Sequence, residues 1–100
     1  MAEFNCYICK GKVMTGEKFT FTKSGAVHFD CFISDRRKSL PPEKHESLRA
    51  LAIVLDVELT HLLGVLGVQN VPENLKETIR VKYKDIEKVC GETTRLISSL

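Results

Sequence analysis

The 100-residue sequence has no long uninterrupted apolar run. Its most apolar stretch, Leu48 to Leu66, is interrupted by Arg49, Asp56, Glu58 and His61, so we expect no membrane span and no membrane partner. Met1 to Lys10 lack a charged leader followed by an apolar block, which predicts a cytoplasmic protein with reduced cysteines. With 43% apolar and 28% charged residues, the chain is expected to form one small soluble domain.

The sequence also lacks the usual signatures of an enzyme. It has no glycine-rich phosphate loop, no nucleophile elbow and no zinc signature with an open coordination position. We therefore predict a non-enzymatic protein with no catalytic residue and no organic cofactor. A large basic excess is missing too, because the net charge is only +2, and composition alone leaves nucleic-acid binding open.

Aromatic and aliphatic residues are concentrated in different halves of the chain. Six of the seven aromatics and three of the four cysteines lie in the first 32 residues, and Pro41-Pro42 marks the junction between the halves. We predict a finger over residues 1–40 and a helical hairpin over residues 41–100, packed together as one composite domain. The fold class is therefore a small α+β zinc-binding domain.

The first half is predicted to consist of turns and short strands. Phe19 to Thr22 has strand-forming residues, Lys23-Ser24-Gly25 has turn chemistry, and Ala26 to His28 returns. Together these segments predict a β-hairpin. The finger aromatics are expected to form its small core and could also cover the helices; they are Phe4, Phe19, Phe21 and Phe29.

The second half is predicted to form two long amphipathic helices. The first begins near Pro42 and Glu43 and ends at Gly64 or Gly67, and leucines recur along it at three- and four-residue steps. The second follows Pro72 and continues toward the end of the chain. Two such helices expose their apolar stripes unless another surface covers them. The finger could do so, or two chains could pair through their helices as a homodimer.

Four potential metal ligands lie in two close pairs. Cys6 and Cys9 are separated by two residues, as are His28 and Cys31, with eighteen residues between the pairs. Three thiolates and an imidazole suit tetrahedral zinc. A Cys-x2-Cys turn directs two sulfurs to one point, and Gly11 is expected to supply a permissive backbone angle there. If a helix begins near His28, both members of the second pair lie on the same side of its first turn.

This pattern predicts one structural Zn²⁺ ion held by Cys6, Cys9, His28 and Cys31. Four protein ligands leave no open position for substrate, so the site would not be catalytic. The alternatives are a redox dithiol or a simple packing role for the thiols. A redox role is less favoured, because dithiols of the thioredoxin kind follow a strand and open a helix, whereas no strand is predicted before Cys6.

The spacing also carries a resemblance. Residues 6–32, CYICKGKVMTGEKFTFTKSGAVHFDCF, resemble the first zinc module of a LIM domain, a treble-clef-like finger, down to the Gly16-Glu17 pair and the final H-x2-C-F. A LIM domain would continue with cysteines at the positions of Ser34 and Arg37, so the second module is absent. The whole chain is similar to a small family of archaeal proteins of unknown function, a resemblance that implies no activity.

The leading hypothesis is a structural zinc finger that serves protein–protein association, with a protein partner or a second copy. The alternative is nucleic-acid binding through a basic finger surface formed by Lys10, Lys12, Lys18, Lys23 and residues 36–38.

Three further residues are assigned no ligand role. Cys90 lies on the helical stripe and is expected to be a small buried apolar residue. His45 and His61 have no partner at metal-ligand spacing.

Overall fold

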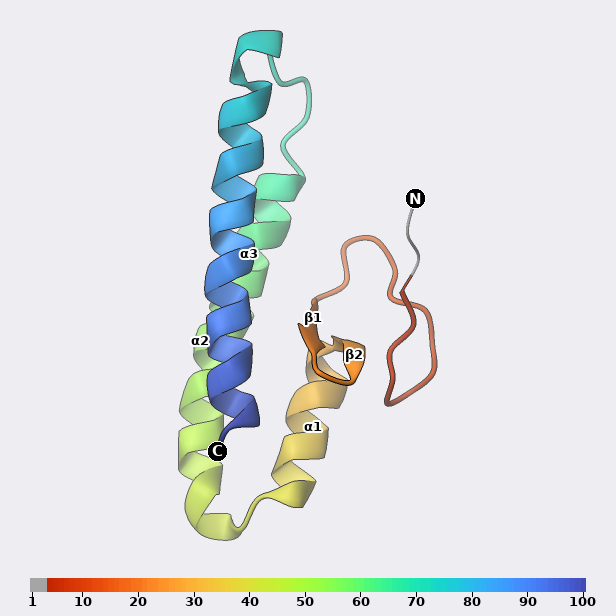
Figure 1. Cartoon of the computed structure of the whole chain (residues 1–100), viewed down its shortest axis with the longest axis vertical. Coiled ribbons are helices and arrows are strands. Elements are labelled where there is room, and N and C mark those ends of the chain that lie inside the picture. The colour runs from red at the N-terminus through yellow and green to blue at the C-terminus, as the bar shows by residue number, and fades with distance from the viewer. Residues whose placement is uncertain (1–3) are drawn as a thin grey trace.

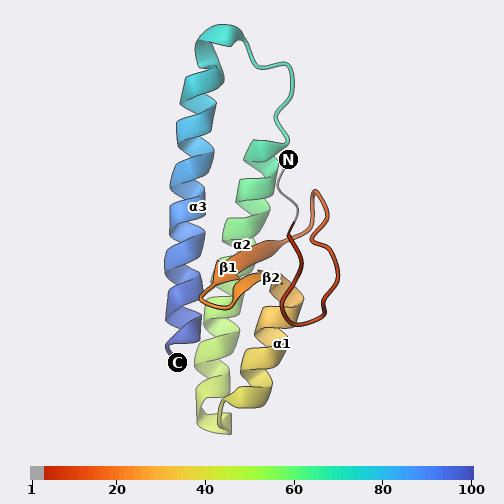
Figure 2. The same cartoon turned by 45° about the vertical axis from the view of Figure 1, so that its right-hand side comes forward.

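The computed structural model describes residues 4–100 and shows a small α+β protein. A hairpin of β1 (Phe19–Thr22) and β2 (Gly25–His28) leads directly into α1 (Phe29–Ser39). The long helices α2 (His45–Leu66) and α3 (Lys76–Ser98) follow, each preceded by a short 3-10 turn, η1 (Pro42–Lys44) and η2 (Glu73–Leu75). The long helices lie side by side and antiparallel, with the hairpin and α1 against one side of them (Figures 1 and 2).

The hairpin confirms the sequence prediction. β1 and β2 pair antiparallel, with Phe19 opposite His28 and Thr22 opposite Gly25. Gly25 has a positive φ of 123°, a backbone conformation that glycine adopts without a Cβ penalty. The register brings His28, one of the predicted ligands, to the end of β2 and the start of α1.

Helix α1 is the main departure from the sequence prediction, which assigned turns and short strands to the first half and considered a helix only near His28. Phe29–Ser39 form 11 residues of α-helix. Asp30 in the first turn and basic residues 36–38 in the last turn complement the helix dipole. His45 secures the C-terminal end, because its Nε2 lies 3.0 Å from the carbonyl oxygens of both Arg37 and Leu40.

Both predicted long helices are present. The first is preceded by a 3-10 turn that begins at Pro42. The helix continues through Gly64 and ends at Leu66, just before Gly67. The second continues through Gly91 without interruption. Within the described residues, no helix combines the length and apolarity needed to cross a bilayer.

The first half and the helices share one hydrophobic core. It combines Cys6, Val27 and Phe32 with residues from both long helices: Leu48, Leu55, Leu59, Cys90 and Ile97. A buried hydrogen bond of 2.7 Å joins the hydroxyls of Thr20 on β1 and Thr94 on α3. The hairpin is therefore tied to the helices by both apolar and polar contacts.

The finger aromatics only partly form a core. The rings of Phe4, Phe19 and Phe21 pack together with centroids 5.0–6.0 Å apart, and they line a groove with leucines of α2. Phe4 and Phe21 are nevertheless 37% and 53% exposed. The prediction of a buried core was wrong for these two rings, and the buried aromatic residue of the first half is Phe32, which is 2% exposed and packs in the core shared with the long helices.

Candidate metal centre

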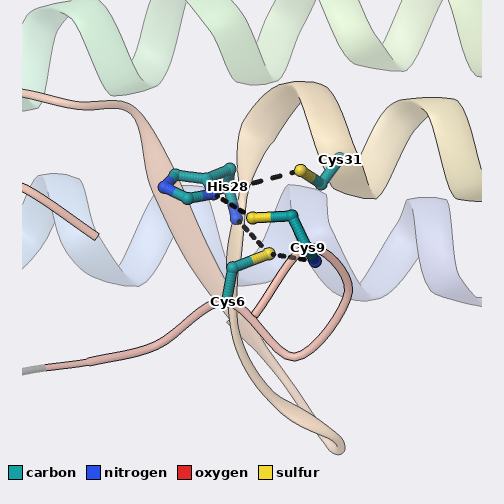
Figure 3. Close-up of side chains that lie close together, drawn as sticks. All are labelled: Cys6, Cys9, His28 and Cys31. Carbon is teal, nitrogen blue, oxygen red and sulfur yellow. Dashed lines mark hydrogen bonds between the residues drawn. The ribbon is translucent and has the colours of Figure 1, made fainter. Parts of the chain in front are cut away.

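The two predicted ligand pairs meet at one point (Figure 3). One ligand atom each from Cys6, Cys9, His28 and Cys31 lies within 4.8 Å of all the others. Cys6 is fully buried, whereas Cys9 is exposed and the other two are partly buried. Such a cluster of three sulfurs and one ring nitrogen could hold one metal ion.

A tight turn holds the first pair. The N–H of Lys10 donates to the carbonyl of Cys6, and the N–H of Cys6 donates to the carbonyl of Gly11, both at 2.9 Å. The left-handed conformation that the turn requires falls on Lys10, with φ of 67°, and the prediction that Gly11 adopts it was therefore wrong. Gly11 contributes its N–H instead, which donates to Cys9 Sγ at 3.4 Å.

The second pair lies at the junction of strand and helix. His28 ends β2 and serves as the N-cap residue of α1, and Cys31 follows within the first turn of that helix, as the spacing predicted. The N–H of Tyr7 donates to the carbonyl of Ala26 on β2 at 3.0 Å. This hydrogen bond joins the cysteine turn to the hairpin, and so brings the first pair of ligands to the second.

Backbone donors make Cys6 a strong anionic ligand. Burial of the thiol raises its pKa, but N–H groups of Cys9, His28 and Ile8 lower it by more, to about 6. The N–H groups of Cys9 and His28 each lie 3.5 Å from the sulfur. The sulfur is therefore favoured as a thiolate, the form that binds metal ions.

The other donors compete for protons. Burial lowers the pKa of His28, but the neighbouring Cys9 and Cys6 side chains and the Glu17 carboxylate raise it to about 9. Burial and the same two cysteines raise the pKa of Cys31 to about 11. Crowded sulfurs stabilise protons at this point, and a bound cation would replace those protons because metal ligands bind in their deprotonated forms.

Glu17 lies on the far side of the His28 ring. The Nδ1 atom of His28 faces the sulfurs, 3.3 Å from Cys9 Sγ and 3.9 Å from Cys31 Sγ. Its buried Nε2 atom makes no hydrogen bond to the described residues but lies within ion-pair distance of Glu17, 3.4 Å from Oε1, and that oxygen accepts the N–H of Met14 at 2.6 Å. A carboxylate behind a histidine is a common way to orient a metal ligand. The sequence alone did not predict this contact, because the spacing of the residues does not show that the Glu17 carboxylate lies near His28 Nε2.

The remaining candidate residues lie elsewhere. Cys90 is buried on α3, and burial followed by the charge of Glu58 raises its pKa to about 11. This confirms the prediction of a buried thiol. The Cys6–Cys9 turn passes into an extended segment rather than a helix, unlike the dithiol arrangement considered above.

The predicted basic surface is divided among several segments. Lys18 is paired with Asp56 of α2, with Nζ 2.5 Å from Oδ1. Lys10 lies in the cysteine turn, Lys12 in the bridge that follows it, Lys23 in the hairpin turn, and residues 36–38 at the end of α1. The three basic residues on α1 complement the helix dipole. Nucleic-acid binding stays a prediction.

The fold and the cluster together define a small α+β protein with a potential Cys3His metal site. Residues 2–99 match the family model DUF2175, described as an uncharacterized protein conserved in archaea, and the chain therefore belongs to this family. This confirms the whole-chain resemblance found in the sequence. No curated protein and no solved structure matches the chain.

Proposed function

We propose that Cys6, Cys9, His28 and Cys31 hold one structural Zn²⁺ ion. The observation that carries this proposal is the convergence of three sulfurs and one imidazole nitrogen within 4.8 Å. Softer thiolate and borderline imidazole ligands select zinc over magnesium or calcium, which prefer oxygen. The N–H donors around Cys6 support the same assignment, because they stabilise the thiolate that zinc requires.

The finger around this ion is proposed to be treble-clef-like, as in the first module of a LIM domain. The order of elements supports this assignment: a cysteine turn, a β-hairpin, and a helix whose first turn supplies the last ligand. The two cysteines that would begin a second LIM module are replaced by Ser34 and Arg37 on α1. The proposed finger is therefore a single module that packs on its own helices.

The role of the ion is proposed to be structural and non-enzymatic. Zinc, when bound, supplies a tetrahedral cross-link between the cysteine turn and the start of α1. Four protein ligands leave no position for a reactive water, and no catalytic residue is assigned. The finger and the helical hairpin are proposed to form a single composite domain that serves protein association.

Metal analysis with matched cysteine variants tests the zinc proposal. Elemental mass spectrometry of the purified wild-type protein is expected to find about one equivalent of zinc per chain. Cys9→Ser is expected to lose most of the metal, whereas Cys90→Ser, the matched change outside the cluster, keeps it. Less than about half an equivalent in the wild type, or equal zinc content in the Cys9→Ser variant, would contradict the proposal.

A further inference from the structure

The outer face of α2 is exposed and uncharged through the middle of the helix. Its residues recur at alternating steps of four and three, the spacing of a helix-pairing seam. We call them the outer seam: Ala50, Val54, Val57, His61 and Gly64. All five are exposed, and Val57 is 63% exposed.

The outer seam lies opposite the face of α2 that already packs in the core. At roughly 100° per residue, Val57 points away from buried Leu48, Leu55 and Leu59. A solvent-facing helix usually has one apolar stripe and a charged opposite face. Because α2 is apolar on both sides, its pattern is typical of a helix that is covered on both sides.

Helix α3 provides the contrast within the same molecule. Opposite its buried residues it exposes charged side chains, among them Lys84, Asp85, Lys88 and Glu92. This is the ordinary pattern of a surface helix. The exposed face of α2 therefore lacks charged residues along the outer seam, whereas the exposed face of α3 has them.

The exposed area of the whole chain also leaves room for a partner. A compact monomer of 11.3 kDa is expected to expose about 5,700 Å². This chain exposes 6935 Å², and its radius of gyration is 14.8 Å, against about 13 Å for a compact 100-residue domain. The excess of about 1,200 Å² exceeds the roughly 800 Å² that each partner buries in a standard interface.

We propose that the outer seam pairs antiparallel with the outer seam of a second copy of this chain, with the two-fold axis at Val57. Ala50 precedes Val57 by seven residues and Gly64 follows it by seven, so each Ala50 lies opposite Gly64 of the partner subunit. These two small residues allow the helices to approach closely. This isologous contact brings Val57 against Val57 of the partner subunit, and a seam without Asp, Glu, Lys or Arg avoids like-charge repulsion.

This inference rests on the association role proposed above and names the partner. The metal centre is made by the cysteine turn and the start of α1, not by the outer seam. The zinc proposal and the pairing proposal can therefore fail separately.

The first test is the mass of the zinc-loaded full chain by sedimentation equilibrium. The wild type is expected to have twice the mass of one chain, and Val57→Glu half that dimer mass, because two like charges then meet at the axis. The matched control is Val81→Glu on α3, which replaces a valine that is 45% exposed and leaves the dimer intact. Unchanged far-UV circular dichroism and zinc content show that each variant is folded.

Three results would overturn the pairing. The first is a wild type that does not form a dimer, even if it associates with another protein. The second is a Val57→Glu variant that stays dimeric. The third is loss of the dimer in both the Val57→Glu and the Val81→Glu variants. A monomer with one equivalent of zinc would refute the dimer and leave the metal proposal standing. A dimer that contains no zinc would refute the metal proposal and leave the pairing proposal standing.

The second test establishes the direction of pairing. Ala50→Cys and Gly64→Cys chains are treated with a short bismaleimide, alone and after mixing, with wild type as the control for the native thiols. Gly64 tolerates the change, because an added Cβ meets no atom within 4 Å. Cross-linked dimer is expected only in the mixture. Cross-linking of Ala50→Cys to itself would indicate parallel pairing, and no cross-link in the mixture would indicate a different surface; either result overturns the proposal.

Discussion

We propose that the two halves of this chain reach a defined structure by different means. The first half has only two strands of four residues and an 11-residue helix, so it contains little regular secondary structure. The second half pairs helices of 22 and 23 residues along an aliphatic stripe. Four convergent ligands can replace many apolar contacts in a small segment, whereas long helices obtain stability from the area that they bury.

Metal removal should separate the two halves most strongly. Chelation of zinc-loaded protein is expected to unfold residues 4–39 and to leave most of α2 and α3 helical, because structural zinc contributes an apparent ~10 to 16 kcal/mol in finger peptides. Hydrogen exchange followed by NMR gives the measurement residue by residue. Protected amides in the hairpin after complete removal of the metal would refute the difference between the halves.

A cavity in the helical half should produce the converse result. Leu55 is fully buried, so Leu55→Ala is expected to lower the free energy of unfolding by about 2 to 5 kcal/mol while the zinc content stays at one equivalent. Leu96→Ala, at a leucine that is 57% exposed, is the matched control and should cost much less. Denaturant titration measures both, and loss of zinc in folded Leu55→Ala protein would contradict the separation.

Glu17 tests the finer structure of the metal centre. Glu17→Ala is expected to weaken zinc binding about 10- to 100-fold, because we propose that the carboxylate, 3.4 Å from Nε2, orients the His28 ring and increases its basicity. Glu17→Gln keeps an oxygen for the Met14 N–H but loses the charge, so its loss should be intermediate. Competition with a chromophoric chelator gives the affinity, and the ¹⁵N shift of His28 Nε2 reports the ring directly.

Glu43→Ala, at an exposed glutamate of η1, is the control for this series and should bind zinc as the wild type does. If the Glu17→Gln variant also matches the wild type while the alanine variant is weaker, the residue acts only through the Met14 turn. In that case the carboxylate charge has no role at the metal.

The hydroxyl pair between the halves should give the smallest effect. Thr94 donates to the carbonyl of Cys90 at 2.8 Å, so its oxygen accepts from Thr20. Thr20→Val removes that donor and should cost about 1 kcal/mol, whereas Thr94→Val leaves a buried hydroxyl without an acceptor and should cost about 1 to 3 kcal/mol. Equal costs, or no coupling in a double-mutant cycle, would mean that this bond does not join the halves.

Much of this architecture could be predicted from local sequence patterns. Ligand spacing predicted that Cys6, Cys9, His28 and Cys31 meet at one point. Strand-forming residues and turn chemistry located the hairpin, and leucine periodicity located the first long helix. These patterns succeed because they depend on backbone geometry over a few residues.

Features that depend on contacts between segments could not be predicted in the same way. Helix α1 was missed beyond its first turn because its signal lies in the charges at its two ends, and the carbonyls at its C-terminal end are bonded by His45 from the following segment. Lys10, not Gly11, took the left-handed angle because the hydrogen bonds of the turn determine the position. Glu17 meets His28 only after the chain has folded.

Zinc-edge X-ray absorption on the purified protein tests the central claim most directly. A closed structural site predicts three sulfur ligands at about 2.3 Å and one nitrogen at about 2.0 to 2.1 Å, with no water in the coordination shell. A shell with fewer sulfurs and an oxygen ligand would mean that the site is open, and would contradict both the ligand set and the non-enzymatic role proposed for it.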